Sequence, residues 1–248
     1  FHNALDENIN IENLRFNSEK LDYIYNNIKE IKIQRPETPL IVFCGGPLTT
    51  FLFMFRRNEL NKDFNHVIKL FYKEKKKCIR IMEMITEASV EYVNNQVDSG
   101  IDCFQLFETY CGILPEQLYT EIVLPYSKEI LNAAMNKNCK TIFFPKNYNT
   151  GLKNINKDIC DIASIDWQLP LESARTLLCN SVGIQGNMDP RIFFSDKAEI
   201  EKYLINLTRF GQKNTNWIFN LGHGFIPGID VENVNFVVDW IKNYNWNR

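Results

Sequence analysis

The chain has 248 residues, of which 45% are hydrophobic and 13% aromatic, and its formal net charge is -2. This charge argues against a non-specific nucleic-acid binder, and no apolar run approaches the roughly 20 residues that a membrane span needs. We therefore expect a single domain over residues 1–248, with neither a nucleic acid nor a membrane as partner. Seven cysteines without CxxC spacing indicate free thiols in a reducing compartment.

In chain order, six short apolar runs are typical of buried parallel strands. They cover residues 40–44, 101–107, 141–144, 162–167, 182–185 and 217–220. Between the runs, apolar residues recur at three-to-four spacing, which predicts helices. These helices cover residues 64–96 (as two helices), 115–134, 199–210 and 231–244, and residues 1–39 are polar and helical in character.

Alternating strands and helices predict an α/β fold with a parallel sheet, either doubly wound or a (β/α)8 barrel. Nearly every predicted strand is followed at once by a polar or glycine-rich cluster, which favours a barrel because its mouth is built from many strand ends. A barrel has eight βα units and six are visible. Either two strands lie within residues 1–39 or the first two are lacking.

The most informative stretch is Asn220–Pro227, with the sequence NLGHGFIP. It places His223, one of three histidines, at the carboxyl end of a predicted strand between two glycines that let a ligand approach the backbone. The alternative is a glycine-rich turn with an incidental histidine. The cluster Gly45-Gly46-Pro47 matches neither GxGxxG nor GxxxxGK[ST], so a nucleotide loop is disfavoured.

Other polar residues at strand ends have structural explanations. Asp166 and Asp189 are expected to cap helices or form turns. Glu108 stays open between a solvated charge at the rim and a functional group. The only basic residues directly after strands are Lys146 and the pair Arg56-Arg57, and the pair is expected on a solvated helix surface.

Read together, these clusters resemble the uroporphyrinogen decarboxylase family, in family order from about residue 36 to the end. QGN-DP and NLGHG-P, about thirty residues apart, are the specific motifs. The matching segments are Phe43–Thr49, Gln105–Thr109 with Gly112, Leu124–Tyr126, Asp166-Trp167, Gln185–Pro190 and Asn220–Gly224 with Pro227.

The resemblance implies a (β/α)8 barrel, usually a homodimer, in the cytoplasm or in plastids. It implies decarboxylation of the four acetate side chains of uroporphyrinogen III to coproporphyrinogen III in haem synthesis, without cofactor or metal. A pyrrole protonated on a ring carbon is its own electron sink, so the protein has to supply only orientation and electrostatics. His223 and Thr109 match substrate-contacting positions and are the candidate catalytic residues, while Phe43 and Phe107 match residues that line the cleft.

Three departures from the family pattern affect the expected activity. The family's amino-terminal arginines and aspartate have no counterpart here, and the first residue is Phe1, so we expect a missing upstream segment. Phe53 stands at the position of a substrate-binding tyrosine, and Leu48 replaces a tryptophan. We therefore expect the 248 residues alone to form an inactive, aggregation-prone partial barrel with two exposed strand edges.

Two alternatives remain. A catalytically impaired relative could act as a binding or dimerisation module, and Phe53 favours this. A zinc-dependent methyltransferase of the same superfamily is disfavoured, because its metal needs an HxC pair and a later cysteine. Here Gly224 and Phe225 follow His223, and no cysteine lies beyond Cys179.

Overall fold

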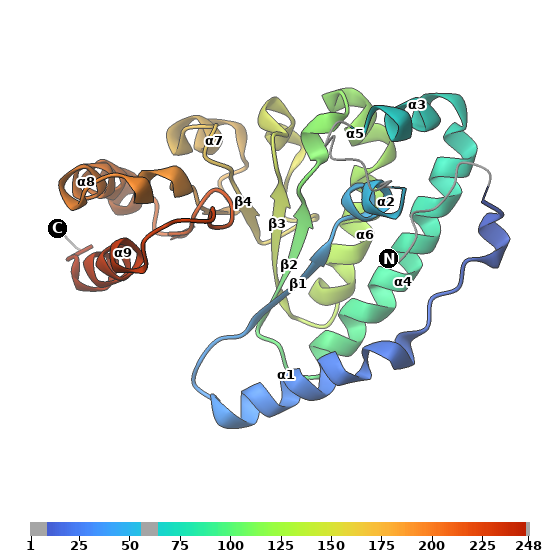
Figure 1. The fold of residues 1–248 in the computed structure, drawn as a ribbon, viewed down its shortest axis with the longest axis horizontal. Coiled ribbons are helices and arrows are strands. Elements are labelled where there is room, and N and C mark those ends of the chain that lie inside the picture. The colour runs from blue at the N-terminus through green and yellow to red at the C-terminus, as the bar shows by residue number, and fades with distance from the viewer. Residues whose placement is uncertain (1–8, 56–63, 247–248) are drawn as a thin grey trace.

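The computed structural model describes residues 9–55 and 64–246, and its centre is one sheet of six parallel strands (Figure 1). The strands lie side by side in chain order, which confirms the six predicted βα units. They are β1 (Ile41–Gly45), β2 (Cys103–Glu108), β3 (Lys140–Pro145), β4 (Ile162–Ser164), β5 (Gly183–Gln185) and β6 (Trp217–Ile218).

Helices flank this sheet, with α6 packed against β2 and β3, α4 packed against α6 and β1, and α8 and α9 together at the carboxy-terminal end of the fold (Figure 1). The predicted helix over residues 115–134 is wrong in one respect, because Val123 separates it into two. The helices are α1 (Asp22–Gln34), α2 (Pro47–Met54), α3 (Asn65–Lys73), α4 (Lys75–Asp98), α5 (Glu116–Ile122), α6 (Leu124–Met135), α7 (Leu171–Leu177), α8 (Lys197–Lys213) and α9 (Val231–Asn243).

The amino-terminal part of the described chain holds no further strand. Residues 9–40 form two short 3-10 turns, Ile11–Asn13 and Ser18–Leu21, followed by α1. The two additional strands considered for residues 1–39 are therefore not within residues 9–39, and residues 1–8 lie outside the described part. Among the described helices, none is both long and apolar enough to cross a membrane.

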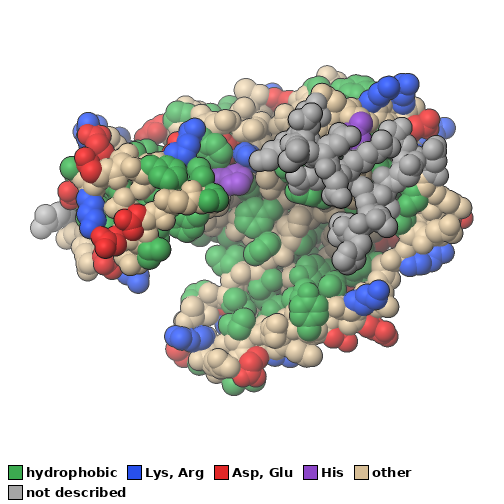
Figure 2. All heavy atoms as spheres, viewed as in Figure 1, with side chains coloured by type: hydrophobic (Ala, Val, Ile, Leu, Met, Phe, Trp, Pro, Cys, Tyr) green, Lys and Arg blue, Asp and Glu red, His purple; other side chains and the backbone are tan. Residues whose placement is uncertain are grey.

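The two faces of the sheet differ in burial. Phe104 and Leu106 of β2 point outward and are fully buried in the main core with residues of α4 and α6. On the inner face of β1, Ile41 is 46% exposed and Phe43 is 60% exposed. Among the described strands β1 pairs only with β2 and β6 only with β5, so the sheet is an open arc. Figure 2 shows hydrophobic side chains gathered on its concave face.

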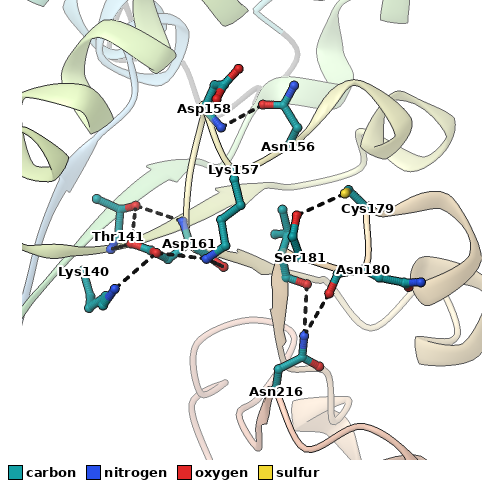
Figure 3. A network of polar contacts seen from close by, with 11 residues as sticks. Lys140, Thr141, Asn156, Lys157, Asp158, Asp161, Cys179, Asn180, Ser181 and Asn216 are labelled. Atoms are coloured by element: carbon teal, nitrogen blue, oxygen red, sulfur yellow. Dashed lines mark hydrogen bonds and ion pairs between the residues drawn. The ribbon is translucent and has the colours of Figure 1, made fainter.

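A network of charged and polar side chains joins the amino ends of the strands (Figure 3). Asp161, just before β4, accepts a hydrogen bond from the backbone N–H of Thr141 at 3.1 Å. The same carboxylate pairs with Lys157 at 3.0 Å and with Lys140 at 3.5 Å. Both lysines of this network thus share one acidic partner, as suits the end of a barrel-type sheet that serves stability.

Candidate active site

The loops at the carboxyl ends of the strands enclose a cavity of about 250 Å³. It contains Thr109, which follows β2, and His223, which follows β6, so the two polar residues predicted to contact substrate share one space. The residues that line it are Gln105, Phe107, Thr109, Phe144, Ser164, Asn220, Leu221, His223 and Gly224.

A row of three phenyl rings crosses the inner face beside this cavity. Phe107 and Phe144 are register partners on β2 and β3, and their rings meet edge to face at 5.7 Å. Phe43 on β1 meets Phe107 edge to face at 5.2 Å. Alternation along each strand places these rings on the concave side, because every second residue faces the same way. The row offers an apolar surface on which a flat ring could pack.

His223 is exposed, and a backbone hydrogen bond fixes the tautomer of its neutral ring. The backbone N–H of Gly224 donates to Nδ1 at 2.8 Å, so the neutral imidazole carries its proton on Nε2. Partial burial of the ring lowers the pKa of His223, and the nearby positive charge of Lys146 lowers it further. A neutral imidazole with a free Nε2–H can donate a hydrogen bond to a carboxylate.

The loop that carries His223 packs tightly against the loop after β4. A side-chain carbon at Gly222 would lie 2.3 Å from the backbone nitrogen of Trp167, so only glycine permits this approach. The Trp167 and His223 rings then meet edge to face at 5.7 Å. Asn187 holds the same β4 loop from the other side, because its amide donates to the carbonyls of Asp166 and Leu169.

The two aspartates have the structural roles expected for them. Asp166 is buried, and its carboxylate accepts the backbone N–H groups of Asn147 at 2.8 Å and Gln168 at 2.9 Å. Asp189 caps the 3-10 turn Pro190–Phe194 and pairs with Arg191 at 2.6 Å. These groups order the strand-end loops and leave the cavity lining to other residues.

Glu108 does not lie at a solvated rim. Its side chain is fully buried and accepts the backbone N–H groups of Leu48 at 3.2 Å and Thr49 at 2.7 Å, which are otherwise unpaired at the start of α2. Burial raises the pKa of Glu108 to about 7, against the effect of these hydrogen bonds. A side-chain carbon at Gly46 would lie 2.4 Å from this carboxylate, so the Gly-Gly-Pro cluster accommodates Glu108.

Phe53 lies on α2 outside the cavity lining. Its ring meets those of Tyr110 at 5.7 Å and Phe64 at 6.3 Å, in an aromatic cluster at the same end of the sheet. Position 53 therefore contributes ring contacts here and no hydroxyl. Arg56-Arg57 lie outside the described residues.

The site contains one feature that was not predicted from the sequence, a pair of cations on one indole. The ammonium of Lys146 lies 5.3 Å from the centre of the Trp167 ring, and the guanidinium carbon of Arg191 lies 5.5 Å from it. Lys146 is half-buried, and removal from water lowers its pKa. The position of Arg191 directly after QGN-DP was the only signal for it in the sequence.

The sequence model of the uroporphyrinogen decarboxylase (URO-D) family matches residues 2–244. The chain belongs to the uroporphyrinogen decarboxylase family. A relative named uroporphyrinogen decarboxylase from Trichlorobacter lovleyi is 31% identical over 97% of this chain and 72% of its own length. One from Chlorobium luteolum is 33% identical over 90% of this chain and 65% of its own length. The chain thus spans about two thirds of the length of these relatives.

Solved structures share the fold at low sequence identity. A methyltransferase from Methanosarcina mazei superposes with a TM-score of 0.73 at 14% identity, over 92% of this chain and 67% of that structure. A B12-independent methionine synthase from Shewanella gives a TM-score of 0.65 at 12% identity, over 88% and 64%. Together with the family match they identify the sheet as six strands of a (β/α)8 barrel. In the described part of the chain, no three His, Cys, Asp or Glu side chains gather as metal ligands would.

Proposed function

We propose that this chain forms the substrate site of a decarboxylase that converts uroporphyrinogen III to coproporphyrinogen III. The observation that carries the proposal is the common cavity of Thr109 and His223, with Phe107 and Phe144 in its wall. Polar donors on a phenyl-lined surface suit a substrate that combines flat rings with carboxylates. Membership of the uroporphyrinogen decarboxylase family supports the choice of substrate.

The size of the cavity indicates how much of the substrate it holds. At about 250 Å³ it is smaller than the roughly 300–1,000 Å³ of pockets that enclose a drug-sized ligand. It therefore takes one pyrrole ring with its acetate, and the rest of the macrocycle extends over the concave face. Phe43, with 60% of its surface exposed, lies on that face beside the cavity wall.

The reaction needs little chemistry from the protein. A proton added to a pyrrole ring carbon makes the ring a cation, and the carbon–carboxyl bond then breaks with its electron pair flowing into the ring. Carbon dioxide leaves, a second proton converts the exocyclic methylene to a methyl group, and the ring carbon returns its proton. We assign the Nε2–H of His223 and the hydroxyl of Thr109 to hold and orient the acetate carboxylate, without cofactor.

A catalytically impaired relative is the second candidate. Phe53 supports it, because this residue sits in a ring cluster with Phe64 and Tyr110 and brings no hydroxyl of its own. To test it, the chain is fused behind the segment of the Trichlorobacter relative that has no counterpart here, and coproporphyrinogen is measured. Product formation supports the enzyme. Uroporphyrinogen binding with no product, also with Phe53→Tyr, supports a binding module.

The proposed site is tested by titrating the chain with uroporphyrin, the oxidised and fluorescent form of the substrate. We expect His223→Leu and Thr109→Val each to weaken binding about tenfold, since each removes a hydrogen bond to a charged group. His66→Leu is the matched control, because His66 lies on α3 outside the cavity lining. Equal affinity of the wild type and His223→Leu would overturn the proposal.

A further inference from the structure

Lys146 carries a charge at the carboxyl end of the sheet that the described residues do not neutralise with an ion pair. It follows β3 directly, is half-buried, and rests its ammonium on the Trp167 indole, 5.3 Å from the ring centre. Moving a charge out of water is unfavourable unless an opposite charge approaches it. An indole contributes only a modest attraction to a cation. The position therefore favours an anion that comes from outside the chain.

The lysines at the opposite end of the sheet are different. Lys140 and Lys157 both pair with Asp161, at 3.5 and 3.0 Å. An acid is also near Lys146, because Asp166 follows the next strand, but no ion pair joins the two, and the oxygens of Asp166 are turned to backbone N–H groups. The two ends therefore differ in whether the acid forms an ion pair with the lysine beside it.

Lys146 lies near the cavity because it contacts the same Trp167 ring as His223. The ring also contacts the imidazole of His223 at 5.7 Å and the guanidinium of Arg191 at 5.5 Å. Arg191 is neutralised by Asp189, with nitrogen and oxygen 2.6 Å apart. Lys146 is therefore the cation of this cluster that is left for a ligand, and it lies next to a residue of the cavity wall.

We propose that Lys146 binds a substrate carboxylate at the mouth of the cavity, next to the carboxylate held by His223. This rests on the proposed function, whose substrate carries several carboxylates. The neutral imidazole of His223 cannot balance such a ligand, whereas Lys146 supplies a full positive charge. The indole fixes the lysine stem, so less side-chain freedom is lost when the anion arrives. Lys146 is thus a substrate-binding residue that selects for polyanionic ligands.

The experiment compares uroporphyrin affinity by fluorescence titration for the wild type and four variants, each fused behind the same Trichlorobacter segment as above. Lys146→Met removes the charge and keeps an aliphatic stem on the indole, and Lys146→Arg keeps the charge. Lys157→Met is the matched control for loss of a lysine, and His223→Leu tests the cavity itself. Thermal unfolding of each variant reports whether it is folded, and Lys146→Gln replaces Lys146→Met if the latter does not fold.

We expect Lys146→Met to weaken binding about tenfold, Lys146→Arg to stay within about threefold of the wild type, and Lys157→Met to change nothing. If Lys146→Met binds as well as Lys157→Met while His223→Leu binds weakly, the role of Lys146 is overturned and the proposed function stands. If the wild type does not bind, or binds no better than His223→Leu, the proposed function is overturned and the role of Lys146 with it.

Discussion

Glu108→Gln tests which of two opposing effects dominates the pKa of one buried carboxyl group. Burial raises its pKa from 4.5 to about 7, whereas hydrogen bonds from Thr49 and Leu48 at the start of α2 favour the ionised form. Between these pH values the native chain holds a proton that the unfolded chain has lost, so stability from this group falls as pH rises. A shift of this size corresponds to about 3 kcal/mol, lost in full above pH 7.

Glutamine has the shape of the protonated carboxyl and cannot ionise, but its NH2 group cannot accept the N–H of Leu48 as the carboxyl oxygen does. Glu108→Gln is therefore expected to lower the free energy of unfolding by about 1 kcal/mol at pH 5 and to raise it by about 2 kcal/mol at pH 8. Urea denaturation of both proteins at the two pH values measures this, and taking the difference removes the contribution of other titrating groups. Greater destabilisation by Glu108→Gln at pH 8 than at pH 5 would contradict this prediction, because the hydrogen bonds would then outweigh burial.

Three further predictions concern the loops and the thiols. Gly222→Ala should weaken uroporphyrin binding at least tenfold, because the new methyl group would lie 2.3 Å from the backbone nitrogen of Trp167 and displace His223; an unchanged titration would contradict this. Asn187→Ala should lower the free energy of unfolding by about 2 kcal/mol in urea, because two carbonyls of the β4 loop lose their donor, and a change below about 0.5 kcal/mol would argue against that role. Iodoacetamide at pH 7.5 should alkylate Cys179 first, because it is exposed and a neighbouring hydroxyl lowers its pKa, whereas burial raises the pKa of the other six thiols; mass spectrometry identifies the site, and faster labelling elsewhere would contradict the prediction.

The strands were predictable because each one has a short apolar run bounded by polar or glycine-rich clusters. The helix α2 was not, since its eight residues are almost all apolar and show no helical period. Its amino end is completed by Glu108, which lies sixty residues after Leu48 in the sequence. Alternation along β2 did carry a signal for this, because Glu108 falls on the same face as the buried Phe104 and Leu106. Pro125 likewise marked the break between α5 and α6.

The motifs indicated where the candidate site lies, but the contacts within it could not be predicted from the sequence. The position of Thr109 and His223 after strands placed both at the same end of the sheet, where the cavity joins them. That Lys146 and Arg191 rest on one indole depends on how three loops fold back, and no spacing in the sequence shows it. The specific motif residue Asn187 serves the loops as a hydrogen-bond donor, so a distinctive motif need not mark a ligand contact.

The proposed function requires that the strand-end loops bind a polyanionic tetrapyrrole in one common cavity. The most direct measurement is the electron density of the chain crystallised with uroporphyrin. We predict the macrocycle against Phe107, with one carboxylate at Nε2 of His223 and another at Nζ of Lys146. Density for the porphyrin only at the amino ends of the strands, beside Asp161, would contradict the account.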